Sequence, residues 1–96
     1  MNNQMNKLAV LLDESDIPYH REINGMGNDH ICYPTFGEDR ICSVICGTYT
    51  YGGDQGLLEI MGLLTPEEEE YDEVLGYLTA DQVFERIKNH WESTRK

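Results

Sequence analysis

The segment Arg40–Cys46 (RICSVIC) constrains the fold more than any other stretch, because it has no charged residue after Arg40. In an extended strand, one face would carry Ile41, Ser43 and Ile45 and the other Cys42, Val44 and Cys46. A strand with one face in water alternates apolar and polar residues, whereas a strand covered on both faces does not. The sequence therefore predicts that Arg40–Cys46 is a central strand.

Two further strands are predicted before it, at Ile17–Ile23 and His30–Pro34, with turns at Asn24–Gly25 and Phe36–Asp39. Arg21 interrupts the apolar side of the first, which favours an edge position. Leu57–Leu64 is apolar and short enough to be a strand or a short helix. We favour a strand, because glycine bounds the segment.

Apolar residues at helical spacing predict a helix at each end of the chain. The first spans Asn2–Asp13, and the second begins at Ala80 behind a capping box formed by Thr79 and Gln82. Their expected inner stripes are Met5, Leu8, Ala9 and Leu12, and Ala80, Val83, Phe84, Ile87 and Trp91. Between Leu64 and the last helix, one helical turn, an exposed acidic loop and a core-docking segment at Val74–Leu78 are expected.

These elements predict a single α+β domain over residues 1–96. An N-terminal helix and a C-terminal helix pack on an antiparallel meander of three to four strands. The opposite face of the sheet must then be solvated, covered by loops 47–56 and 65–78, or buried in a dimer. The apolar strand faces slightly favour a homodimer.

A net charge of −11, from 18 acidic and 7 basic residues, disfavours binding to nucleic acid or to an anionic membrane. The longest apolar runs, such as Leu8–Leu12, are too short to span a membrane, and no signal peptide is recognisable at the N-terminus. A cytoplasmic location is expected. The charge favours a protein partner with a basic surface.

The strongest concentration of charge is the run from Glu67 to Glu73, which is a candidate surface for that partner. Tyr71 could supply an apolar anchor within it. A solvated loop is the plain alternative. The candidate residues are Glu67, Glu68, Glu69, Glu70, Tyr71, Asp72 and Glu73.

The loop 47–56 (GTYTYGGDQG) is a second candidate site, for a small nucleotide-like ligand. Glycines allow a ligand to approach the backbone, and tyrosines offer stacking surfaces. No phosphate-binding motif is present, so a plain turn is the alternative. The candidate ligand-binding residues are Tyr49, Tyr51, Gly52, Gly53 and Asp54.

The cysteines raise a third alternative, a metal-dependent enzyme. If paired residue numbers in the central hairpin sum to 76, one face carries His30, Cys32, Cys42 and Cys46, a set suitable for zinc. Yet Cys42 and Cys46 would lie about 13 Å apart along the strand, which is unlike a zinc knuckle. We therefore expect free buried thiols, with no metal, no cofactor and no catalytic residues.

The C-terminal half contains GTYTYGGDQGLLEIMGLL and VLGYLTADQVFERI. Over about residues 44–91 it resembles short uncharacterised proteins of phages and prophages of Gram-positive gut bacteria. This resemblance implies a phage context, in which small acidic proteins often bind and inhibit host proteins. The resulting hypothesis is a non-enzymatic acidic binding protein, encoded by a phage, that binds or inhibits a host protein through its acidic surfaces.

Overall fold

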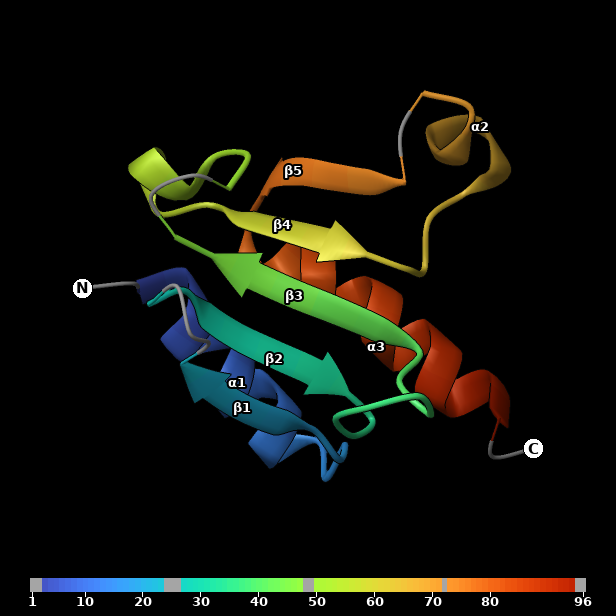
Figure 1. Cartoon of the computed structure of the whole chain (residues 1–96). Coiled ribbons are helices and arrows are strands. Elements are labelled where there is room, and N and C mark those ends of the chain that lie inside the picture. The colour runs from blue at the N-terminus through green and yellow to red at the C-terminus, as the bar shows by residue number, and fades with distance from the viewer. Residues whose placement is uncertain (1–2, 24–26, 48–49, 72, 95–96) are drawn as a thin grey trace.

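The computed structural model describes residues 3–23, 27–47, 50–71 and 73–94, and shows one sheet with two long helices (Figure 1). Helix α1 spans Asn3–Glu14 and α3 spans Ala80–Thr94. The strands are β1 His20–Ile23, β2 Asp29–Tyr33, β3 Cys42–Cys46, β4 Leu58–Met61 and β5 Val74–Leu78. Two short helices complete the chain, η1 at Gly53–Gln55 and α2 at Pro66–Glu69.

The five strands lie side by side in chain order, and each is antiparallel to its neighbours. This confirms the predicted α+β meander, with β3 at its centre and β1 at one edge. The strand count exceeds the prediction because Val74–Leu78 pairs with β4 as a fifth strand. Leu57–Leu64 contributes β4, as expected for a segment bounded by glycine.

The first strand is shorter than predicted, because Ile17 leaves the sheet and packs into the core with 3% of its surface exposed. Arg21 lies on β1 opposite Ile31. Its guanidinium is tied to Asp29 by hydrogen bonds of 3.0 and 2.6 Å and to Asn6 of α1 by one of 2.9 Å. These partners explain how a charged residue is accommodated on the apolar side of an edge strand.

The register of the central hairpin, β2 with β3, differs by one residue from the register that would place the cysteines and His30 on one face. Tyr33 pairs with Cys42 and Asp29 with Cys46, so paired numbers sum to 75. Side chains alternate between faces, so a shift of one residue moves each to the other side. The prediction of His30, Cys32, Cys42 and Cys46 on one face is therefore wrong.

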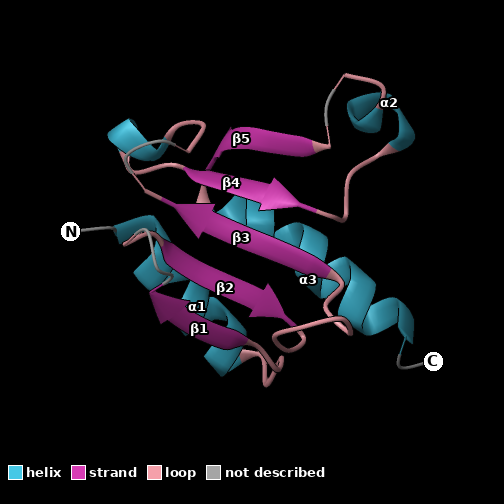
Figure 2. Cartoon of the chain, in the orientation of Figure 1, coloured by secondary structure: helices cyan, strands magenta, loops and turns pink. Residues whose placement is uncertain are grey.

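Both long helices cover the same face of the sheet, behind the strands in the view of Figure 2. The core lies between them and this face, and the predicted helix stripes are confirmed. Gln4 of α1 accepts a hydrogen bond of 2.7 Å from the backbone amide of Ala80, which joins the two helices. The most deeply buried core side chains include Met5, Leu8, Leu12, Ile31, Tyr33, Val44, Leu58, Ile60, Val83 and Ile87.

Candidate binding groove

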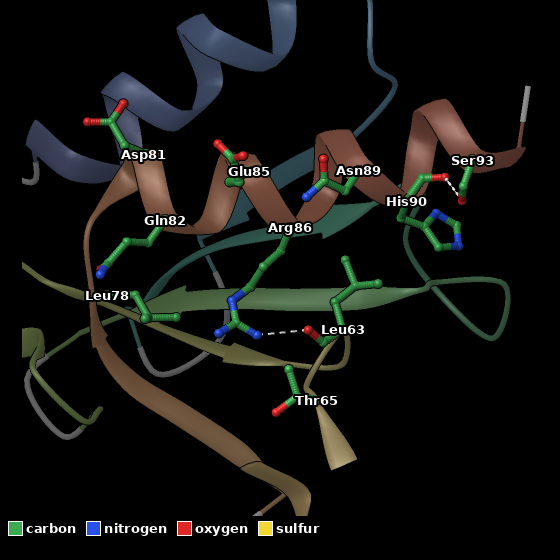
Figure 3. A pocket seen from close by; sticks show the side chains of 10 residues that line it. All are labelled: Leu63, Thr65, Leu78, Asp81, Gln82, Glu85, Arg86, Asn89, His90 and Ser93. Carbon is green, nitrogen blue, oxygen red and sulfur yellow. Dashed lines mark hydrogen bonds between the residues drawn. The ribbon is translucent and has the colours of Figure 1, made fainter. Parts of the chain in front are cut away.

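An open groove of about 800 Å³ runs along the outer side of α3, between this helix and the segment that follows β4 (Figure 3). One wall comes from α3, which begins at Ala80 behind the predicted capping box. Thr79 and Gln82 exchange side-chain-to-amide hydrogen bonds of 2.9 and 3.3 Å there. The lining residues are Leu63, Thr65, Leu78, Asp81, Gln82, Glu85, Arg86, Asn89, His90 and Ser93.

The α3 wall consists of two rows of polar side chains spaced by four residues. Residues four apart lie above one another on a helix surface, so each row forms a continuous ridge beside the buried stripe. The rows are Asp81, Glu85, Asn89 and Ser93, and Gln82, Arg86 and His90. Leu63 and Leu78 add apolar surface to this otherwise polar groove.

Arg86 spans the groove and binds α2. Its Nη1 and Nη2 atoms donate hydrogen bonds of 2.8 and 2.7 Å to the two carboxylate oxygens of Glu68. Nη1 also donates to the backbone oxygen of Leu63 at 2.9 Å. Glu68 in turn completes the capping box of α2, accepting from the amide of Thr65 at 2.8 Å. The cation of the groove is thus neutralised by a carboxylate at its rim.

This arrangement holds both partners charged. The hydrogen bonds from Arg86, with a further contribution from Thr65, lower the pKa of Glu68 from its ordinary 4.5 to about 2. The same contact raises the pKa of Arg86. Glu68 is therefore a structural member of the acidic run, and it is not freely available to a partner.

Other carboxylates around the groove are exposed. Asp81 binds Lys7 of α1 at 2.8 Å, with both side chains more than half exposed. In contrast, the side chains of four glutamates make no hydrogen bond or ion pair with any other described residue, and these are Glu67, Glu69, Glu70 and Glu85. The groove and its rim therefore carry an excess of unpaired negative charge.

The acidic run adopts the predicted form, one helical turn followed by exposed chain. Glu67, Glu68 and Glu69 lie in α2, and Tyr71 is 90% exposed just beyond it. Glu73 is exposed as well, immediately before β5, and Asp72 lies outside the described residues. The run is thus placed beside the groove, which the sequence did not indicate.

His90 closes the far end of the lining and connects α3 to the sheet. Its Nδ1 atom lies 2.7 Å from the hydroxyl oxygen of Tyr33, with the two rings nearly perpendicular and 5.5 Å apart. Tyr33 is fully buried. In the tautomer protonated at Nε2, Nδ1 accepts the phenol proton, and Nε2 remains free to donate.

The glycine-rich loop 47–56 is closely packed. Tyr51 and Asp54 are exposed, Gly52 is buried, and Tyr49 lies outside the described residues. Several amides of the loop donate to oxygens within it or at its base, and these donors are Gly47, Thr50, Tyr51, Gly53, Gln55, Gly56 and Leu57. The described residues of the loop therefore offer a ligand mainly the side chains of Tyr51 and Asp54, and few free amides.

The cysteines are divided between the two faces of the sheet. Cys42 and Cys46 lie in the core, and all three thiols are free and buried, as expected. Burial raises the pKa of Cys42 to about 12. Cys32 lies on the other face, 3.3 Å from His30 Nε2. Within the described part of the chain, no three His, Cys, Asp or Glu residues are placed to hold a metal ion.

Sequence reasoning identified the acidic run but missed the α3 wall, including Asp81, Glu85, Arg86 and His90. The four-residue spacing of polar residues beside the core stripe was an available signal. This spacing alone does not reveal a groove, because the other wall is the segment Leu63–Thr65. Only the tertiary fold brings that segment next to α3.

Comparisons of this chain with protein-family models, with curated proteins and with solved structures found no match. Among the described residues, no helix has both the length and the apolar character required to cross a membrane.

Proposed function

We propose that the protein is a non-enzymatic binding protein of the cytoplasm, which receives a basic segment of a partner protein in the groove beside α3. The observation that carries this proposal is the pairing of charges. Arg86, the one Lys or Arg among the lining residues, is neutralised by Glu68, whereas the side chains of Glu85 in the groove and of Glu67, Glu69 and Glu70 beside it pair with no other described residue.

An arginine or lysine suits this groove for two reasons. Its charged end can pair with the exposed carboxylate of Glu85, and its aliphatic stem can lie on Leu63 and Leu78. The net charge of −11 adds long-range attraction, which accelerates association with a basic surface. Tyr71, almost fully exposed, can add an aromatic contact to the same partner.

If the chain is phage-encoded, as its C-terminal half suggests by resemblance, the natural partner is a host protein whose basic surface it blocks. Such a basic surface is common on proteins that handle nucleic acid. Binding there would inhibit by occupying the surface, without any chemical step.

The test measures binding of a fluorescent arginine-rich peptide by anisotropy. The double variant Glu69→Gln/Glu85→Gln removes one charge from the groove lining and one from α2, the helix that Glu68 ties to Arg86. Its matched control, Asp54→Asn/Glu38→Gln, removes two exposed charges elsewhere. We expect a loss of affinity of about tenfold for the groove variant and less than about twofold for the control.

Equal losses in the two variants would show that only the overall charge attracts the peptide, and would contradict a groove. Absence of binding at low salt would contradict the proposal outright. A separate experiment adds nucleotides to the protein without the peptide and measures the change in its melting temperature. A thermal shift that Tyr51→Ala removes would favour the loop 47–56 as the binding site instead.

A further inference from the structure

The sheet face opposite the helices has no covering layer among the described elements. Register assigns to this face the strand residues that pair with one another across it: His20 with Cys32, Glu22 with His30, His30 with Ile45, Ser43 with Met61, and Met61 with Val74. Both long helices pack on the other side (Figure 1). Among the described elements, this open face of the sheet therefore has no helix packed on it.

An apolar band crosses the open face, centred on Met61. Met61 lies directly between Ser43 of β3 and Val74 of β5, and diagonally from Ile45. It also lines a shallow hollow together with Ile41. Met61 is 48% exposed and Ile41 40% exposed. Met61 is the last residue of β4 and Ile41 directly precedes β3, so these exposed apolar side chains gather toward one end of the strands, where a solvated face would carry polar residues.

Phe36 extends the band to the other edge of the sheet. Its ring lies 5.6 Å from that of His20 and 6.4 Å from that of His30, which pairs with Ile45. Phe36 itself is 56% exposed, whereas Cys32 beside these histidines is buried. Burial lowers the pKa of His30 and so favours its neutral form, while the charges of Glu22 and Arg40 lie close enough to act on it.

Charge decides what kind of partner fits this face. Among the strand positions assigned to it, the acidic residues are Glu22 and Glu59, and the hollow beside Met61 adds Glu38 and Arg40, which carry opposite charges. Glu22 lies 3.7 Å from His20 Nε2, and Glu59 accepts a hydrogen bond of 3.0 Å from the amide of Tyr51. A basic partner would be drawn to the groove side, where unpaired carboxylates gather. A weakly charged apolar face of a strongly acidic protein is instead where two copies can meet with the least repulsion.

We propose that the open face is the contact surface of a homodimer, in which Met61, Ile45 and Phe36 of each copy pack against a second copy of this chain. A standard interface buries about 800 Å² per partner, which is roughly an eighth of the 6044 Å² surface of this chain. The strands alone span roughly 400 Å² in plane, so Phe36 and the Ile41 segment must contribute. The dimer is therefore of the weak class, with a dissociation constant on the order of 10 µM.

Face-to-face packing leaves α3 and its groove on the outside of each copy. The dimer would therefore present two grooves, and would bind a partner with two basic segments more tightly than one copy does. The dimer itself does not depend on what the groove binds.

Analytical ultracentrifugation of the full chain over a range of concentrations tests the dimer. The wild type should move from the 11.0 kDa chain mass toward twice that value as concentration rises. Met61→Glu should raise the dissociation constant at least about tenfold. The matched control is Val10→Glu on α1, because Val10 is 51% exposed but lies in the helical layer. It should change dimerisation less than about twofold.

Circular dichroism establishes that each variant is folded. If Met61→Glu fails to fold, Phe36→Glu decides, because Phe36 lies in a turn outside the strands. A wild type that stays monomeric at high concentration overturns the proposal. So does a dimer that the folded open-face variant leaves intact, or that Val10→Glu weakens equally. Added salt should strengthen the dimer by screening repulsion, whereas it should weaken peptide binding in the groove.

Discussion

Glu68 and Arg86 form a two-point ion pair that ties α2 to α3, with oxygen-to-nitrogen distances of 2.8 and 2.7 Å. The two residues are 18 positions apart in sequence, and each side chain is about a quarter exposed. The pair fixes the rim of the groove, because α2 is only four residues long and contains no buried residue. A helix this short is not stable by itself.

Breaking this pair should loosen α2. Arg86→Ala is expected to lower the free energy of unfolding by about 1 kcal/mol, because Glu68 can partly recover by contact with water. Arg86→Lys should recover less than half of that loss, since lysine cannot make the two-point contact. Urea unfolding measures both changes. Glu69→Gln, which removes an unpaired neighbouring charge, is the control, and an equal loss there would contradict a specific role for the pair.

Acid should weaken the same contact. The pKa of Glu68 falls from 4.5 to about 2 in the folded protein, so its contribution is present above pH 4.5 and is lost as pH falls toward 2. The stability difference between the wild type and Glu68→Gln should therefore shrink between about pH 5 and about pH 2. Urea midpoints measured across this range provide the test. A difference that stays constant would mean that the Glu68 charge adds nothing to stability.

The sequence predicted the elements better than their arrangement. Periodicity located both helices, because Leu8 and Val83 belong to stripes that only a helix makes continuous. The hairpin register was missed by one residue, since nothing in the turn Phe36–Asp39 distinguishes pairing of Tyr33 with Cys42 from pairing of Pro34 with Cys42. That single step separated Cys32 from Cys42.

The groove was less predictable than the fold. The acidic run is visible in the sequence, but its neighbour Arg86 is reached only through the packing of α3 on the sheet. The sequence predicts that Val74–Leu78 contacts the core, but it does not predict that this segment pairs with β4. That pairing is made by backbone hydrogen bonds, and five residues that include Gly76 show no residue pattern typical of a strand. Long-range pairing, more than local preference, decided these features.

The buried hydroxyl of Tyr33 should contribute measurably to stability through its hydrogen bond to His90. Tyr33→Phe is expected to reduce the free energy of unfolding by about 1 kcal/mol, because the imidazole loses its partner while the ring still fills the core. Tyr71→Phe is the matched control, since Tyr71 is 90% exposed, and it should have no measurable effect. Urea denaturation of the two variants gives the comparison. Equal stabilities would show that the Tyr33 hydroxyl is not engaged.

The loop 47–56 should tolerate a methyl group at one glycine and not at another. A Cβ atom at Gly53 would lie 1.8 Å from the backbone oxygen of Gly47, so Gly53→Ala must displace the backbone of the turn. A Cβ at Gly56 would meet no atom within 4 Å, and only its φ of +75° disfavours alanine. We expect Gly53→Ala to cost more than about 2 kcal/mol and Gly56→Ala about 1 kcal/mol. Thermal unfolding of the two variants distinguishes these costs. If alanine costs the same at both positions, the loop does not have the closely packed form in which its amides donate hydrogen bonds within the loop.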